Sequence, residues 1–318
     1  MTSLARLRDW GLLLACNMIW GSQFVIYKLV QRRIGPVVAA LFAISCATLL
    51  LIPIVQRQKW MTKQTPKSDR MPARDLWEFI LIGIGGQVVA QVFVAWGVRF
   101  TLASNAALLG FTLPVSTALM AYLFLGERMT WIRWLGFLLA IAGVIVCSGI
   151  HWGELSFGSR RFLQGNIMLF LAVNGGAFYN VYSKKLLRRY SPLEVLLYSY
   201  YVAVVFLLPI ALYTEPQSFR NIADLGPTVW VGIILLGVFQ YFLAMVIFLT
   251  VLTRLDATQA GLMNYAIPFF GVLTASIVLH ERLTKFMLLG GLLVLASTLL
   301  VTVYEQNSHS IRMEEPSV

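Results

Sequence analysis

Charged residues are scarce in this chain: they make up 12% of its 318 residues, while 58% are apolar. A soluble domain carries about a quarter charged residues, so this composition excludes an ordinary water-soluble globule. The large apolar share also excludes a disordered chain, because disordered chains are poor in apolar residues. A polytopic membrane protein is the class that remains.

Cysteine and histidine are also rare, with three residues of each. Cys16, Cys46 and Cys147 lie inside apolar stretches and form no CxxC pair, so we expect neither disulfides nor a metal site. The sequence contains no HExxH and no GxSxG motif, which would mark a zinc hydrolase or an activated serine. We therefore expect no enzyme, no catalytic residue and no cofactor.

Long apolar runs without charge are what the sequence has in abundance. They cover residues 10–27, 34–56, 79–98, 100–126, 134–153, 162–183, 195–214, 225–253, 257–280 and 286–304. A helix needs about 20 apolar residues to cross a bilayer, whereas barrel strands would alternate over about 10 residues. The runs predict an all-α polytopic membrane protein with ten transmembrane helices.

Basic residues are distributed unevenly between the two sides of the predicted membrane protein. The tails and the loops after the second, fourth, sixth and eighth runs hold 16 Lys and Arg, and the other loops hold 8. Because cytoplasmic loops collect Lys and Arg, we expect both termini in the cytoplasm and the protein in the inner membrane of the cell. The net charge of +11 then reflects topology and contact with anionic lipid, with no nucleic-acid partner.

The chain also repeats itself. The aligned pairs include Pro114 with Pro268 and Glu127 with Glu281 at a shift of 154, and Asn17 with Asn174 and Pro36 with Pro192 at shifts of 156–157. The repeat divides the chain into residues 1–155 and 156–318, each with five predicted spans. Since five is odd, the second copy enters the membrane from the opposite side, and the sequence predicts two inverted five-helix repeats.

One stretch allows a resemblance to be stated. Residues 103–144 contain Ser104-Asn105-Ala106 and Leu125-Gly126-Glu127 and resemble the EamA-type repeat of the drug/metabolite transporter superfamily. The resemblance implies a ten-helix secondary carrier of amino acids, other metabolites or drugs, often an exporter, with helices 1–4 and 6–9 around a central cavity. The sequence departs from the family at Phe42, where many members have arginine, and at His280, which replaces a glycine.

Prolines in the middle of two runs mark the predicted binding region. Pro114 and Pro268 each remove a helical hydrogen bond and displace the carbonyl four residues earlier, which belongs to Gly110 or Asn264. In hydrocarbon such a carbonyl needs another partner, and matched helix interruptions in two halves point to a midplane site. A simple packing kink is the alternative reading.

Amide and aromatic side chains accompany these prolines in the apolar runs. Buried amides in a bilayer face the bundle interior, where they either join helices together or line a cavity for a polar or zwitterionic solute. The predicted substrate-binding residues are Asn17, Trp20, Gln23, Gln87, Gln91, Trp96, Asn105, Gly110, Pro114, Asn174, Tyr179, Gln240, Tyr241, Asn264, Tyr265 and Pro268.

The sequence therefore predicts a secondary transporter of a small organic metabolite that works by alternating access between its halves. A sensor or scaffold that transports nothing is the alternative. No Asp or Glu lies deep in a predicted span, which favours uniport or exchange over proton coupling. Small residues on the last helix of each half suit either packing within the chain or a homodimer.

Overall fold

The computed structural model describes residues 3–61, 72–125, 130–147, 157–254, 264 and 266–314. Within these ranges all regular structure is helical. The helices are α1 (Ser3–Val30), α2 (Pro36–Met61), α3 (Ala73–Leu81), η1 (Ile82–Val88), α4 (Val89–Phe100), α5 (Ala103–Leu109), η2 (Gly110–Thr112), α6 (Leu113–Leu125), α7 (Trp131–Cys147), α8 (Phe157–Leu186), α9 (Pro192–Thr214), α10 (Pro216–Arg220), η3 (Ile222–Asp224), α11 (Pro227–Leu235), η4 (Leu236–Ala244), α12 (Met245–Leu252), α14 (Ala266–Leu279) and α15 (Lys285–Glu314).

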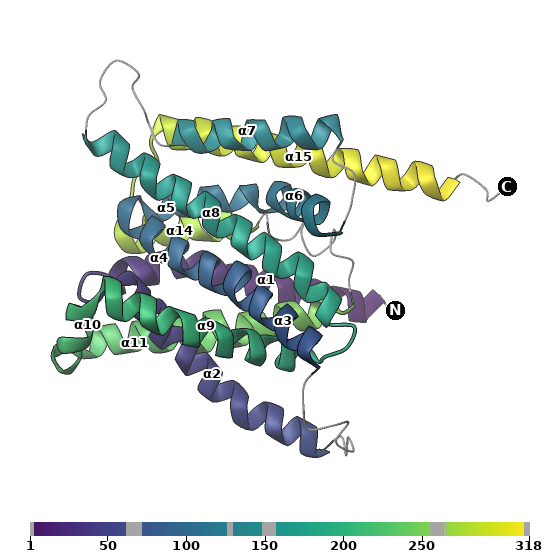
Figure 1. Ribbon diagram of the computed structural model, residues 1–318. Coiled ribbons are helices and arrows are strands. Elements are labelled where there is room, and N and C mark those ends of the chain that lie inside the picture. Colours follow the sequence, from purple (N-terminus) through teal and green to yellow (C-terminus); the bar gives the residue numbers. More distant parts are fainter. Residues whose placement is uncertain are drawn as a thin grey trace.

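The helices form an elongated bundle in which most long axes run in roughly one direction (Figure 1). The pair α7 and α15 packs together along one edge, and α2 packs on α9 at the opposite edge. Between these pairs lie α1, which packs on α14, and α8, which packs on α4 and α6. α1 begins and α15 ends at the same end of the bundle (Figure 1).

Five helices of the described chain are long and apolar enough to cross a membrane. They are Gly11–Val30, Pro36–Met61, Ala73–Phe100, Pro192–Thr214 and Pro227–Leu252, and a sixth span arises if Ala103–Thr112 and Val115–Phe124, bent by 47°, are counted as one. A polytopic membrane protein is therefore supported. The number of ten spans stays a prediction.

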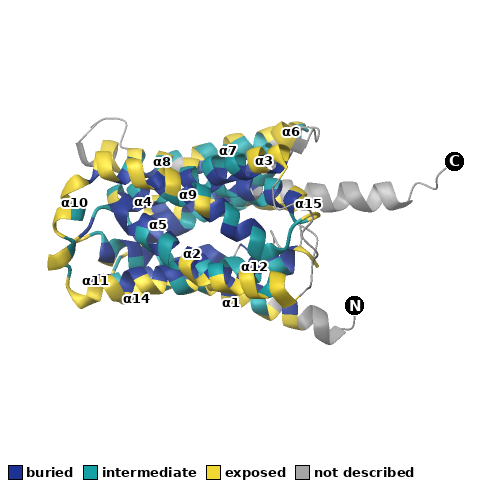
Figure 2. Ribbon diagram, turned by 60° about the horizontal axis from the view of Figure 1, so that its bottom comes forward, coloured by how far each residue is buried: buried dark blue, intermediate teal, exposed yellow. Residues whose placement is uncertain are grey.

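Exposed residues lie on the outside of the bundle and buried residues lie in its interior (Figure 2). Leu49, Val205, Phe269 and Ile277 are 65–69% exposed, whereas Asn17, Asn105, Asn166 and Gln240 are at most 4% exposed. In water such an apolar surface would aggregate, but in a bilayer it faces lipid, and internal polar groups find their partners inside the protein.

Of the two helix interruptions that the sequence predicted, the one near Pro114 is present, because the 3-10 turn η2 separates α5 from α6 and the two parts are bent by 47°. Among the described residues α14 begins at Ala266, so Pro268 lies in a first helical turn, where its missing N–H costs little. The carbonyl oxygen of Asn264 accepts from the backbone N–H of Ile267 at 3.1 Å, and that of Gly110 accepts from Leu113. The expectation that both carbonyls need an outside partner is wrong, because short-range backbone bonds satisfy them.

One of the two residues that depart from the family pattern, His280, has a backbone conformation that is usual for glycine. Its φ of 55° is left-handed, a region that costs a residue with a side chain about 1–2 kcal/mol. It follows directly on the last residue of α14, and the next N–H, that of Glu281, lies 3.5 Å from the carbonyl oxygen of Ala275. A left-handed residue directly after a helix is the position where glycine is usual.

Candidate functional site: a central cavity

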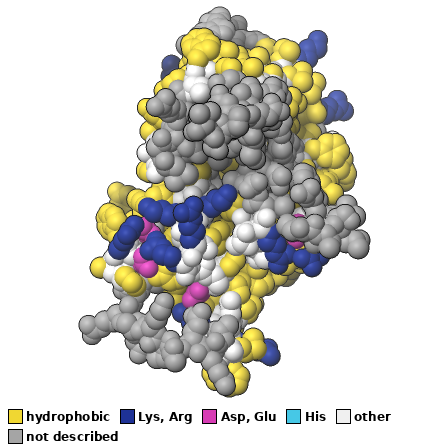
Figure 3. Space-filling model, turned by 90° about the vertical axis from the view of Figure 1, so that its right-hand side faces the viewer, with side chains coloured by type: hydrophobic (Ala, Val, Ile, Leu, Met, Phe, Trp, Pro, Cys, Tyr) yellow, Lys and Arg dark blue, Asp and Glu magenta, His cyan; other side chains and the backbone are white. Residues whose placement is uncertain are grey.

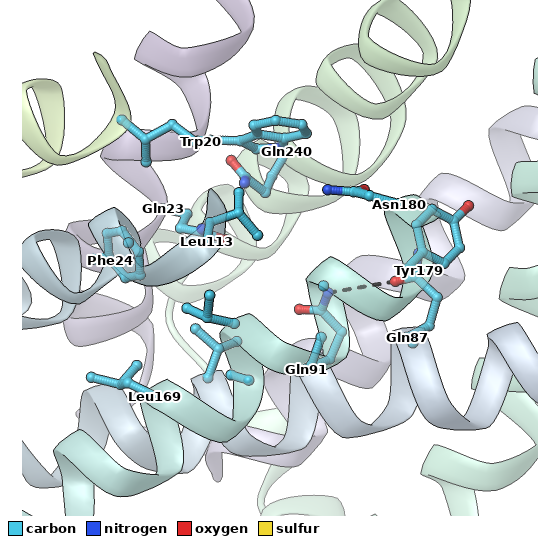
Figure 4. Close-up of a pocket in the computed structure, with 18 of the residues that line it drawn as sticks. Trp20, Gln23, Phe24, Gln87, Gln91, Leu113, Leu169, Tyr179, Asn180 and Gln240 are labelled. Carbon is cyan, nitrogen blue, oxygen red and sulfur yellow. Dashed lines mark hydrogen bonds between the residues drawn. The ribbon is translucent and has the colours of Figure 1, made fainter. Parts of the chain in front are cut away.

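A cavity of about 180 Å³ lies inside the bundle (Figure 4). Its lining comes from α1, η1, α4, α5, η2, α6, α8, η4, α12 and α14, so residues from both halves of the sequence meet there. The lining residues are Trp20, Gln23, Phe24, Gly86, Gln87, Ala90, Gln91, Val94, Ala106, Gly110, Leu113, Leu169, Ala172, Val173, Gly176, Tyr179, Asn180, Gln240, Tyr241, Met245 and Ile267. None of these residues is charged. An engineered apolar cavity of about 150 Å³ holds benzene, so this space fits a solute with one ring.

Half of the predicted binding residues line this cavity. They are Trp20, Gln23, Gln87, Gln91, Gly110, Tyr179, Gln240 and Tyr241. The amides of Gln91, Asn180 and Gln240 extend into the space that the labelled residues surround (Figure 4). Helices far apart in the sequence thus bring the predicted amides together with Trp20 at one site.

The other predicted residues lie outside the lining, and several join helices together instead. The Nδ2 of Asn105 donates to Thr101 at 3.0 Å and to Asn166 of α8 at 2.7 Å. Asn174 donates to the carbonyl oxygen of Phe170 in its own helix at 2.8 Å. For Asn105 the alternative reading, a polar contact that joins two helices, describes the structure, whereas the bond of Asn174 stays within α8.

The remaining predicted residues are accounted for as follows. Asn17 and Asn264 are buried away from the lining, and Trp96 packs edge-to-face on Phe93 with ring centroids 6.4 Å apart. Pro268 lies behind Gly110, since its Cγ is 3.6 Å from the place a Cβ on that glycine would take. Tyr265 and the side chain of Pro114 lie outside the described residues.

A chain of hydrogen bonds crosses one wall of the cavity. Tyr241 donates to Oε1 of Gln91 at 2.5 Å, and Nε2 of Gln91 lies 3.5 Å from Oε1 of Gln87 (Figure 4). The hydroxyls of Tyr27 and Tyr241 are 2.5 Å apart. Tyr200 of α9 donates to the backbone oxygen of Tyr241 at 2.7 Å. These contacts hold Gln91 in one orientation.

On the opposite wall a second amide is held between α1 and η4. Oriented by its surroundings, Gln240 donates to the backbone oxygen of Ile19 at 3.0 Å and accepts from Nε1 of Trp20 at 3.3 Å. The Trp20 ring also lies against Phe248, with ring centroids 5.0 Å apart. The indole is therefore fixed at the edge of the cavity.

Two π-helical segments carry cavity residues, and the sequence did not predict either of them. η1 supplies Gly86 and Gln87, and η4 supplies Gln240 and Tyr241. A π-helical turn widens a helix and often occurs at functional sites. Apolar lining residues such as Met245 were also missed, because an apolar side chain that faces a cavity reads the same in sequence as one that faces lipid.

Helices α2 and α9 are joined at both of their ends. At the start of α2 the carboxylate of Glu215, just after α9, accepts from the backbone N–H groups of Val37 and Val38 at 3.1 and 2.9 Å. At the end of α2 the Nζ of Lys59 lies 3.3 Å from Glu194, in the first turn of α9. The two helices are therefore antiparallel.

A second carboxylate holds a helix start in the same way. Glu281, which follows the left-handed His280, accepts from the N–H groups of Ala103 and Ser104 at 3.1 and 2.9 Å and from the Ser104 hydroxyl at 2.7 Å. A helix N-terminus carries partial positive charge, so a carboxylate stabilises it. Glu281 thereby joins the segment after α14 to the start of α5.

An ionic cluster joins α3 to the turn between α8 and α9. Arg189 pairs with both Asp75 and Glu78, Tyr190 donates to Asp75 at 2.6 Å, and Lys185 lies 3.6 Å from Glu78. Burial lowers the pKa of Arg189, but its bonds to Glu78 and Asp75 outweigh this and raise the pKa overall. Lys and Arg gather at this end of the bundle (Figure 3), where α1 begins.

An apolar outer surface around an internal cavity of amides and aromatic rings is the construction of a membrane protein that passes small solutes through the bilayer. Sequence comparison agrees with this class. The chain belongs to the EamA-like transporter family, which it matches over residues 10–149 and again over residues 163–303.

Individual relatives carry transporter names. The chain is 32% identical over 239 residues to a protein of Streptantibioticus cattleyicolor named "Probable terminal-alkyne amino-acid exporter", covering 74% of this chain and 76% of the relative. It is 23% identical to an S-adenosylmethionine uptake transporter of Rickettsia conorii, covering 91% and 90%. A solved crystal structure shares the fold with a TM-score of 0.63 at 16% identity and covers 98% of this chain and 99% of its own. The chain is thus a small-molecule transporter of a membrane.

Proposed function

We propose that this chain is a secondary carrier that moves a small amino-acid-like, amine or drug-like solute by alternating access between two inverted five-helix halves, residues 1–155 and 156–318. Both termini lie in the cytoplasm, and the protein resides in the inner membrane. The solute occupies the central cavity. The observation that carries the proposal is that the cavity lies between corresponding residues of the two halves.

The burial pattern of α1 and α8 supports the duplication. At a shift of 156 the buried residues coincide, as in the pairs Leu13 with Leu169, Tyr27 with Ser183 and Val30 with Leu186. A shift of 157 would pair buried Tyr27 with exposed Lys184. The burial pattern of these two helices therefore favours a shift of 156 over the shift of 157 that pairs Asn17 with Asn174.

The cavity lining supports the same arrangement. Most lining residues have a repeat-related partner that also lines the cavity: Trp20 with Gly176, Gln23 with Tyr179, Phe24 with Asn180, Gly86 with Gln240, Gln87 with Tyr241, Gln91 with Met245, and Leu113 with Ile267. A site between two related halves faces either side of the membrane when the halves exchange conformations.

Close helix contacts are also repeated. A Cβ on Gly83 of η1 would lie 2.5 Å from that of Val202, and a Cβ on Gly237 of η4 would lie 2.8 Å from that of Cys46. Gly237 follows Gly83 by 154 positions, and Val202 follows Cys46 by 156. Together with the antiparallel pairing of α2 and α9, this supports halves related by an axis in the membrane plane.

Filling the cavity tests the proposal. No atom lies within 4 Å of a Cβ placed on Gly176, so Gly176→Leu adds bulk to the cavity without a backbone clash. We expect it to fold and to lower flux at least tenfold in proteoliposomes loaded with phenylalanine, phenylalaninamide or phenethylamine. Gly11→Leu is the control, because Gly11 is exposed on α1 with the same open surroundings.

The outcomes separate the two candidate functions. Wild-type flux through Gly176→Leu would remove the cavity from the pathway. Binding of a probe by the wild-type protein without flux of any of the three would favour the sensor or scaffold over the carrier.

A further inference from the structure

The hydrogen bonds along the cavity wall run in one direction. Tyr241 has one hydroxyl proton and gives it to Gln91, so in the 2.5 Å contact with Tyr27 it is Tyr27 that donates. Gln91 in turn offers an N–H to Gln87. The order is therefore Tyr27 to Tyr241 to Gln91 to Gln87, and each oxygen after the first accepts from its predecessor.

At the end of this wall a second pair of hydroxyl groups has a defined donor and a defined acceptor. Ser199 gives its proton to the backbone oxygen of Leu196 at 2.9 Å, so Tyr179 is the donor in its 3.3 Å contact with Ser199. The hydroxyl oxygen of Tyr179 interacts with the neighbouring Gln87. Protons of both tyrosines thus point into the protein, away from a solute in the cavity.

What remains toward the cavity is a set of N–H donors. The amide oxygens of Gln91 and Gln87 each accept one bond within this wall and are turned toward its other members, while each amide nitrogen carries two protons. Gln91 gives one of its protons to Gln87 and keeps a second. An amide can present either its oxygen or its nitrogen, and here the oxygen of Gln91 faces Tyr241 while its nitrogen faces Gln87.

Tyr241 is in turn held from two sides. Tyr27 of α1 reaches its hydroxyl and Tyr200 of α9 reaches its backbone oxygen, and all three tyrosines are at most 3% exposed. Neither Tyr27 nor Tyr200 lines the cavity. They are positioning residues, which act on the solute through Tyr241 and Gln91.

We propose that Gln91 and Gln87 recognise an acceptor oxygen of the solute, that of a carboxylate or a carbonyl group, and that Tyr241 fixes this preference. The proposal rests on the carrier function and names its substrate class. Because no lining residue is charged, an isolated anion would pay an uncompensated desolvation cost, so the oxygen belongs to a zwitterion or a neutral molecule. Trp20 and Phe24 receive its apolar part.

Three probes with the same ring separate the chemistry. Phenylalanine presents a carboxylate, phenylalaninamide a carbonyl, and phenethylamine no acceptor oxygen at all. Their dissociation constants are measured by ligand-dependent thermal stabilisation of the full-length protein in detergent. We expect phenylalanine, phenylalaninamide or both to bind the wild type at least tenfold more tightly than phenethylamine, and the stronger of the two identifies the oxygen source.

Gln91→Glu replaces the donor nitrogen with an acceptor at constant shape. It should reverse the order, so that phenethylamine binds at least tenfold more tightly than phenylalanine. Gln217→Glu, the same change on the exposed helix α10, should keep the wild-type order. Gln91→Met removes the oxygen and the nitrogen of the amide without adding charge, so it should abolish the preference even if the glutamate variant fails to fold.

Equal binding of all three probes, no binding of any of them, or a wild-type order in Gln91→Met would overturn the assignment. These results leave the carrier function standing if Gly176→Leu still blocks flux. Failure of the proposed carrier function would show in a different measurement: the Gly176→Leu variant would transport the probes as fast as the wild type.

Discussion

Removing the arginine that joins α3 to the α8–α9 turn should destabilise the bundle measurably. The Arg189 side chain is 36% exposed, but the carboxylates that it contacts are nearly buried, at 8% for Asp75 and 5% for Glu78. In Arg189→Ala both carboxylates lose their main partner. Glu78 keeps Arg74 at 3.5 Å and Lys185 at 3.6 Å, and Asp75 keeps the hydroxyl of Tyr190.

The size of the effect follows from these remaining contacts. Breaking a buried ion pair on one side costs about 3–5 kcal/mol, because a charge is left without compensation. Partial exposure of Arg189 and the two other basic partners of Glu78 place this case at the lower limit, about 3 kcal/mol. For a chain of this size that corresponds to an apparent Tm lower by about 6 °C.

The assay is thermal unfolding in one detergent at one heating rate, since unfolding of such proteins is often irreversible. Arg188→Ala is the matched control, because the neighbouring Arg188 is exposed and forms no ion pair that the structure records within its described part. We expect it to stay within 1 °C of wild type. An Arg189→Ala variant as stable as this control would refute the reasoning that the cluster holds α3.

Two further predictions concern His280 and the membrane orientation. His280→Gly should raise the free energy of unfolding by about 1 kcal/mol, because glycine adopts the left-handed φ of 55° without strain. His280→Ala keeps the strain and should show no such gain. Equal Tm values for the two variants would contradict the explanation. The membrane orientation is tested with an impermeant maleimide in a cysteine-free background. Arg188→Cys in the α8–α9 turn should react from the cytoplasmic side and Arg220→Cys at the end of α10 from the outer side, since the two positions lie at opposite ends of α9. Labelling of both from one side would contradict the proposed topology.

Some features of the fold could be predicted from the sequence because a backbone inside the hydrocarbon of a bilayer can adopt few structures. A chain with so many charge-free apolar runs must satisfy its backbone within helices, and the family repeat is visible in the spacing of residues such as Pro114 and Pro268. The cost of placing polar groups in lipid also indicates which side chains face the interior of the bundle. All the polar cavity residues except Asn180 were therefore among the predicted binding residues.

The sequence could not tell a binding amide from a structural one. Gln91 lines the cavity, while Asn105 joins α5 to α8, and both are amides in apolar runs. The difference lies in how each helix is rotated about its axis, which packing between helices decides. The sequence likewise placed Pro268 in mid-helix, whereas the described α14 begins two residues before it.

By itself, then, the amino-acid order determined the class of protein, its family and the set of polar groups that must stay out of lipid, because solvation by the bilayer acts on each residue separately. Only the tertiary structure decided which of those groups share one cavity and which way their protons point. It also decided that Glu215 and Glu281 stabilise the starts of α2 and α5. Such contacts join segments about 178 positions apart and exist only once the helices have packed.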